Sequence, residues 1–244
     1  MNLLSNIILV PYGTGSWSVE AFKVQSFSNR AVRLDAPFPY AAVNKSSKKP
    51  LRLNSEAFNA ASNFDALQDA LPLAFVSNHL KSFCSPWDKL LLLFLDGYFE
   101  HIAEMLCRHH TECTKKLAPF AGLYKVEDWA FSVPKPLPRA HLYAPLNSGG
   151  AWDEGKFVQV DFAFWLGERM TAVLSHPGIL TPAKARERQS RLEQAGVAVV
   201  TFTEEDLAKD RTDLFNRIIG DFGALLDSAG AVPIGPFRPQ MLED

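Results

Sequence analysis

A hairpin pattern in the C-terminal half limits the folds open to this chain more than any other feature. Phe157 to Leu166 is almost entirely apolar, and its one charge is Asp161. Gly167-Glu168 then supplies a tight turn, and Met170 to Leu174 forms the returning strand. A carboxylate in such apolar surroundings requires a partner, so Asp161 predicts either a metal ion or a neighbouring cation beside it.

A buried helix is expected well before the hairpin. Ser85-Pro86 predicts its start, with Ser as the N-cap and Pro at the first helical position. Asp88 then falls in the first turn, where the helix dipole favours a carboxylate. The apolar run Leu90–Leu95 covers most of the helix circumference, which indicates a central helix that ends near the polar stretch after Arg108.

Further elements follow on both sides of the hairpin. The region 115–150 contains five prolines and predicts a long irregular connection, with one strand at His141–Leu146. After the hairpin we expect a helix from Thr181 to Ala195, because Pro182 favours its start and Gly196 its end. The β-branched run 197–202 predicts an internal strand. An acid-rich, capped segment then predicts one amphipathic helix over 203–226.

The N-terminal part differs from the rest of the chain. Short strand-like runs at Ile7–Pro11, Trp17–Val24 and Ala31–Leu34 alternate with glycine, asparagine and proline. The tail contains three prolines, which predict an extended arm. We therefore expect a β-rich N-terminal unit, a core domain and an extended C-terminal tail, with the bounds 1–80, 84–228 and 229–244.

Composition excludes several classes of protein. With 47% hydrophobic and 21% charged residues, the chain is neither disordered nor a coiled coil. Its net charge of −2 excludes a surface that is basic throughout. The longest aliphatic or aromatic run, Leu90–Leu95, is far shorter than the ~20 residues of a membrane helix. No basic residue precedes the apolar start, and three cysteines suit a reducing compartment, so we expect a cytoplasmic protein.

Collected in order, residues 85–227 predict an α-β-β-β-α-β core. This is the layout of the restriction-endonuclease-like, or PD-(D/E)XK, superfamily, and the sequence resembles its small members related to very-short-patch repair endonucleases. Three stretches carry the resemblance: Ser85-Pro86-Trp87-Asp88, Val160-Asp161-Phe162 and Arg188–Phe202. The resemblance therefore implies an α/β, restriction-endonuclease-like core behind the β-rich N-terminal unit.

The resemblance also implies a metal-dependent endonuclease that hydrolyses DNA phosphodiesters. Hard Mg²⁺ takes oxygen ligands, and the family position for one of them is Asp161. The second half of the motif is incomplete, because Leu174 and His176 stand where Glu and Lys are expected. His176 could act instead on the water or the phosphate. Asp88 and Glu187 are the remaining candidates for catalytic residues.

Two rival interpretations stay open. A member of the same fold that has lost cleavage could serve as a DNA-binding or protein-assembly module. Alternatively, the fold could be an unrelated α/β type in which Asp161 is only a buried, hydrogen-bonded residue. Dimers are the commonest protein assemblies, so a homodimer is also among the expected partners.

Nucleic-acid contacts have their own candidates. Lys184, Arg188 and Arg191 lie at i, i+4 and i+7 and predict one basic stripe along a helix. In a nuclease this stripe would follow the phosphate backbone, whereas otherwise it is a solvated helix face. The basic loop 45–52 offers the same two alternatives.

Two weaker signals have structural alternatives. A zinc site is suggested by Cys107, His109, His110 and Cys113, with His101 earlier on the helix, but buried cysteines and paired histidines at a helix end are the favoured explanation. Aromatic residues of the proline-rich connection, such as Trp129 and Phe131, could stack on unpaired bases or fill the core.

Overall fold

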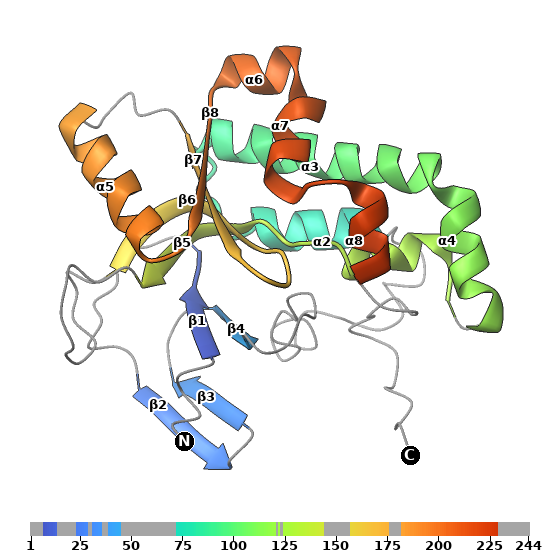
Figure 1. The fold of residues 1–244 in the computed structure, drawn as a ribbon, viewed down its shortest axis with the longest axis horizontal. Coiled ribbons are helices and arrows are strands. Elements are labelled where there is room, and N and C mark those ends of the chain that lie inside the picture. The colour runs from blue at the N-terminus through green and yellow to red at the C-terminus, as the bar shows by residue number, and fades with distance from the viewer. Residues whose placement is uncertain are drawn as a thin grey trace.

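A four-stranded mixed sheet lies at the centre of the fold (Figure 1). The computed structural model describes residues 7–13, 23–28, 31–35, 39–44, 72–120, 122, 124–143, 157–175 and 182–228. The strands of this sheet are β5 (Leu137–Tyr143), β6 (Phe157–Trp165), β7 (Met170–Ser175) and β8 (Ala198–Phe202). They lie in the order β5-β6-β7-β8, with β7 and β8 parallel and the other pairs antiparallel. The expected mixed α/β class is confirmed.

The predicted hairpin is confirmed in β6 and β7. Gly167 has a φ of 89°, a left-handed conformation that glycine adopts without a steric penalty. The Leu166 amide donates to the Arg169 carbonyl over 3.1 Å and closes the turn. This pairing places Phe162 opposite Val173 and fixes which residues of the two strands lie side by side.

One face of the sheet is covered by α3 (Lys89–Arg108) and the C-terminal helices (Figure 1). The ring of Phe94, from the middle of α3, stacks on Phe162 with 4.3 Å between centroids. Phe202 and Phe215 lie against the same ring of Phe94. This aromatic cluster is the centre of the larger core and explains why α3 is apolar on most of its circumference.

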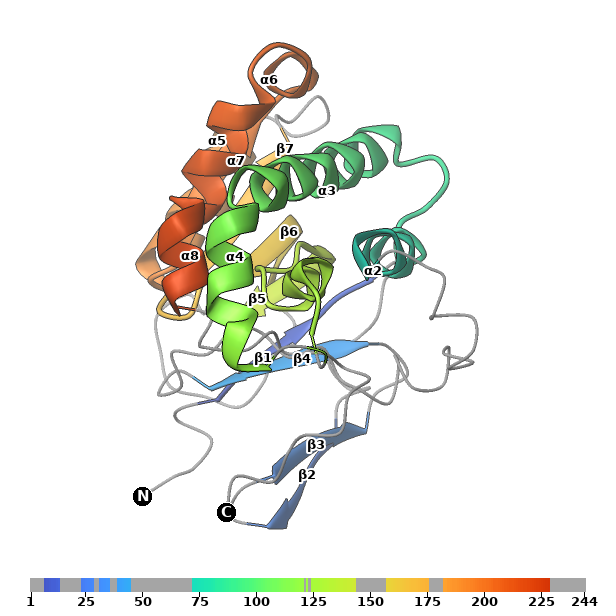
Figure 2. The ribbon, with the colours of Figure 1, turned by 90° about the vertical axis from the view of Figure 1, so that its right-hand side faces the viewer.

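The other face packs on α5 (Pro182–Gln194) and on two N-terminal strands, β1 (Ile7–Pro11) and β4 (Tyr40–Asn44). Figure 2 shows β1 and β4 on the side of the sheet away from α3. The Gly13 amide donates to the Pro138 carbonyl over 2.9 Å, which joins the end of β1 to β5. The sheet is therefore enclosed between two apolar clusters.

The proline-rich connection contains more regular structure than its sequence suggests. The predicted end of α3 at Arg108 is confirmed, but α4 (His110–Leu117) and a 3₁₀ turn, η4 (Ala118–Phe120), follow almost at once. Another 3₁₀ helix, η5 (Val126–Phe131), precedes the sheet. The strand expected at His141 begins at Leu137, because β5 is an edge strand that tolerates Pro138.

The prediction of one continuous helix over 203–226 is wrong. The segment is divided into α6 (Glu204–Lys209), α7 (Arg211–Ile219) and α8 (Phe222–Ser228). The predicted cap is confirmed, since the Asp206 amide donates to the Thr203 hydroxyl over 3.2 Å. The first break falls at Asp210, whose carboxylate accepts from the Asp213 amide and starts α7.

In the described N-terminal residues, the strands expected at Ile7–Pro11 and Ala31–Leu34 are confirmed, whereas β4 was not predicted. Besides the β1–β4 pair, β2 (Lys23–Ser28) and β3 (Ala31–Asp35) form an antiparallel pair. A helix, α2 (Pro72–Lys81), closes this part of the chain and packs beside α3. The basic loop, most of the run expected at 17–24 and the tail after 228 lie outside the described residues. Within the described ranges, no helix has the length and apolar composition to cross a membrane.

Candidate functional site

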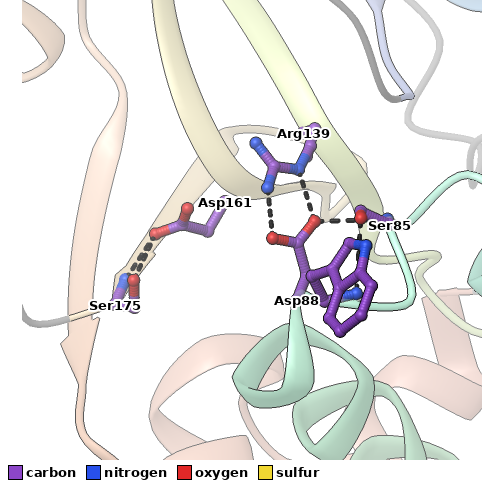
Figure 3. Close-up of polar contacts among 6 residues, drawn as sticks. Ser85, Asp88, Arg139, Asp161 and Ser175 are labelled. Atoms are coloured by element: carbon purple, nitrogen blue, oxygen red, sulfur yellow. Dashed lines mark hydrogen bonds and ion pairs between the residues drawn. The ribbon is translucent and has the colours of Figure 1, made fainter.

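Asp161 lies in the middle of β6 and is half-buried. Its Oδ2 accepts two hydrogen bonds from the end of β7, one from the Ser175 amide at 2.6 Å and one from the Ser175 hydroxyl at 2.9 Å (Figure 3). The sequence pattern predicted a metal ion or a cation beside this carboxylate, whereas its hydrogen-bond partner is the neutral residue Ser175. Arg139 and Arg188 lie near enough for their charges to interact with that of Asp161.

Asp88 immediately precedes α3 and faces the same region of the sheet (Figure 3). Both of its carboxylate oxygens bind Arg139 of β5: Oδ2 accepts from Nε at 2.9 Å, and Oδ1 pairs with Nη2. Oδ2 also accepts from the Ser85 amide at 3.2 Å. This is a two-pronged guanidinium–carboxylate pair, the geometry that makes such pairs strong and orientation-specific.

The start of α3 differs from the prediction. Asp88, rather than Ser85, occupies the position before the first helical residue, Lys89. Its carboxylate makes no capping bond to the helix, because it is engaged by Arg139 and by the Ser85 amide. Ser85 and Pro86 form a turn before the helix. Asp88 therefore connects α3 to the sheet instead of neutralising the helix end.

Arg139 adopts a left-handed backbone with a φ of 46°, which is uncommon for a residue with a side chain. The ladder between β5 and β6 pairs Pro138 with Phe162 and Ala140 with Val160, and it omits the intervening residues Arg139 and Asp161. The bound Asp88 carboxylate raises the pKa of Arg139 against the effect of burial, and the nearby charge of Asp161 acts in the same direction. The site thus coincides with a local irregularity of the sheet.

Strand β6 also changes face at this point. Val158 and Val160 pack in the core cluster beside α5, whereas Phe162 and Phe164 pack in the cluster beside α3. In a regular strand every second residue keeps the same face, so the alternation is interrupted at Asp161. The irregular backbone of the neighbouring edge strand accommodates that interruption.

The three side chains of the predicted basic stripe lie in different environments. Arg188 of α5 donates from Nε to the carbonyl of Gln159 over 2.9 Å, and its Nη2 binds the same oxygen. Burial lowers the pKa of Arg188, while the charge of Asp161 opposes that shift. Lys184 is exposed and Arg191 is half-buried. Arg188 therefore fixes α5 to β6 through Nε and Nη2, and these two donors are not available for a phosphate contact.

The other predicted residues do not join this cluster in the described part of the chain. Leu174 is 6% exposed and packs in the core cluster beside α5. Glu187 lies on the exposed surface of α5. His176 falls outside the described residues. The structure thus brings Asp88 and Asp161 to one site and adds two residues that sequence reasoning missed, Arg139 and Ser175.

The described donors do not fit the expected magnesium ion. Among the residues that the structure describes, no three His, Cys, Asp or Glu side chains are placed to hold a metal. Asp88 is occupied by Arg139, and Oδ2 of Asp161 is occupied by Ser175. Cys107, His109 and Cys113 are among these described residues and form no such group, so the suggested zinc site is not present there.

Aromatic residues near the site are arranged differently from the expectation. Trp129 is fully buried in the core, so base stacking by this residue is excluded. Trp87, directly before Asp88, is 88% exposed.

Comparison with protein-family models, with curated proteins and with solved structures finds no match for this chain.

Proposed function

We propose that this chain is a non-cleaving member of the restriction-endonuclease-like fold that binds nucleic acid beside Asp88 and Asp161. The order α3-β5-β6-β7-α5-β8 supports the fold assignment, because it has the α-β-β-β-α-β layout with a parallel last pair of strands. The N-terminal strands and α2 are additions to that layout.

The observation that carries the loss of cleavage is the engagement of both oxygens of Asp88 and of Oδ2 of Asp161 by protein donors. A divalent ion that activates water needs oxygen ligands with free lone pairs. Arg139 brings a positive charge to Asp88, the place where a second metal-binding carboxylate would be required. Leu174 contributes no donor, so the described residues favour a binding site over a hydrolytic one.

Trp87 and Arg139 support nucleic acid as the ligand. An exposed indole offers a flat apolar surface on which a base can stack, independent of base identity. Arg139 is ion-paired with Asp88, the residue that follows Trp87 in the chain, and 32% of its side chain is exposed. Aromatic side chains combined with basic groups are the usual features of surfaces that bind single strands. We therefore expect a preference for unpaired DNA over duplex DNA.

The test uses the full chain with fluorescein-labelled single-stranded and duplex oligonucleotides. Fluorescence anisotropy should show binding that weakens as salt increases and that favours the single strand. Trp87→Ala should weaken binding roughly fivefold or more, because one stacked base contributes about 1–3 kcal/mol. Leu93→Ala is the matched control, since Leu93 is 50% exposed on α3 and should leave binding unchanged.

Cleavage is tested separately by incubating plasmid DNA with the chain and Mg²⁺ or Mn²⁺. We expect the supercoiled plasmid to stay intact. Nicking that disappears in Asp161→Ala would overturn the non-cleaving assignment in favour of a nuclease. Absence of DNA binding at low salt would overturn the nucleic-acid ligand and favour protein assembly.

A further inference from the structure

A cavity separate from the Asp161 site lies among α2, α3, α4 and η5. It encloses about 450 Å³ and shares no lining residue with the Asp161 site. Its lining consists of Leu73, Ala74, Ser77, Asp96, Phe99, Glu100, Ala103, Leu106, Cys107, His110, Val126 and Glu127. The volume is within the range of pockets that bind small molecules, about 300–1,000 Å³.

The walls and the rim of this cavity differ in chemistry. Leu73, Phe99 and Leu106 give the walls an apolar surface with one aromatic ring. Three carboxylates stand among the lining residues, and neither Lys nor Arg does. An apolar space with an unpaired carboxylate in its lining is complementary to a ligand that combines an apolar body with a positive charge.

The three carboxylates are not equally available to such a ligand. Asp96 pairs with Lys81, and Glu100 pairs with Arg211. Glu127 is exposed and has no ion-pair partner among the described residues. Glu127 is therefore the carboxylate that can bind a cation without first releasing a protein side chain.

We propose that this cavity binds a small amphiphilic amine, with an aromatic or alkyl body inside and its ammonium group near Glu127. Burial of the body provides the apolar contribution, about 25 cal/mol for each Å² removed from water. The ring of Phe99 belongs to the apolar lining that the body contacts. The inference is independent of nucleic-acid binding, because the two sites share no residue.

Three probes of similar size test the charge requirement: 4-phenylbutylamine, 4-phenylbutan-1-ol and 4-phenylbutanoate. Calorimetric titration of the full chain should give tightest binding for the amine, weaker binding for the alcohol and weakest binding for the carboxylate. Equal affinities for all three probes, or preference for the carboxylate, would overturn the proposal.

Two variants test the location. Glu127→Gln should weaken amine binding roughly three- to fivefold, the effect of one exposed charge pair, and leave alcohol binding unchanged. Glu193→Gln on α5 is the matched control and should change neither. Ala103→Trp should fill the cavity and abolish binding of both probes. Amine binding that is unaffected by Glu127→Gln and by Ala103→Trp would refute the site. Because Glu127 is exposed, Glu127→Gln should leave the fold intact.

Discussion

The ion pair between Asp88 and Arg139 should stabilise the fold measurably, because it is only partly exposed. The side chains are 18% and 32% exposed, respectively, and they connect the start of α3 to the edge strand β5. Asp88→Asn removes the negative charge, and Arg139→Met removes the positive charge while keeping an unbranched chain. The double variant completes a cycle that isolates their coupling.

The expected magnitude lies between two known limits. Breaking a buried pair costs about 3–5 kcal/mol, and an exposed pair contributes about 0–1 kcal/mol. The intermediate exposure and the two-pronged geometry place each single variant at roughly 2 kcal/mol of lost stability. The coupling free energy should then be about 1–2 kcal/mol, because each single variant leaves the other residue without its partner.

Urea denaturation of the four proteins, followed by circular dichroism, measures the free energies of unfolding. Lys209 and Glu205 provide the control cycle, since their side chains are 74% and 70% exposed. That control should couple by about 0.3–0.5 kcal/mol. A coupling for Asp88 and Arg139 no larger than the control would refute the reasoning, because the pair would then behave as an ordinary surface contact.

Four further changes test other features. Lys135→Met should raise stability at pH 7, because burial lowers the pKa of Lys135 to about 7, and the gain should shrink toward pH 10 as the unfolded lysine also loses its proton. Burial lowers the pKa of His141 to about 4, so stability should fall as the pH drops from 6.5 toward 4, and His141→Gln should reduce that fall in pH-dependent melts. Phe162→Ala should cost about 3–5 kcal/mol in urea denaturation, as for a large buried ring. Arg139→Gly should unfold at higher urea than Arg139→Ala, because only glycine relaxes at a φ of 46°.

The local sequence pattern predicted the hairpin, because two short apolar runs separated by a glycine-containing turn have few other ways to fold. Phe157 to Leu166 and the returning run each became one strand, with ends within a residue of the expectation. The start of β5 was predicted four residues too late, because Pro138 disfavours a strand when its place at the edge of the sheet is not known. Edge position is a property of the assembled sheet and cannot be derived from a local window.

The site shows the same division between local and long-range information. The lone charge of Asp161 pointed to a partner, but Ser175 becomes adjacent only when β6 and β7 pair. Arg139 lies 51 residues from Asp88 in the chain, so no local spacing indicates their contact. The start of α3 was misplaced for a related reason, because the distant Arg139 engages the carboxylate that would otherwise cap the helix.

The parallel pairing of β7 with β8 has a consequence for how the chain assembles. Among the described elements the antiparallel strands β5, β6 and β7 are consecutive, whereas β8 comes only after the whole of α5. Until then β7 has an open edge, although most of its residues are buried in the native fold. Open apolar edges recruit strands from other chains, and parallel pairings form slowly. Refolding yield should therefore depend on protein concentration, and nascent chains that stop before β8 should be the most prone to aggregate.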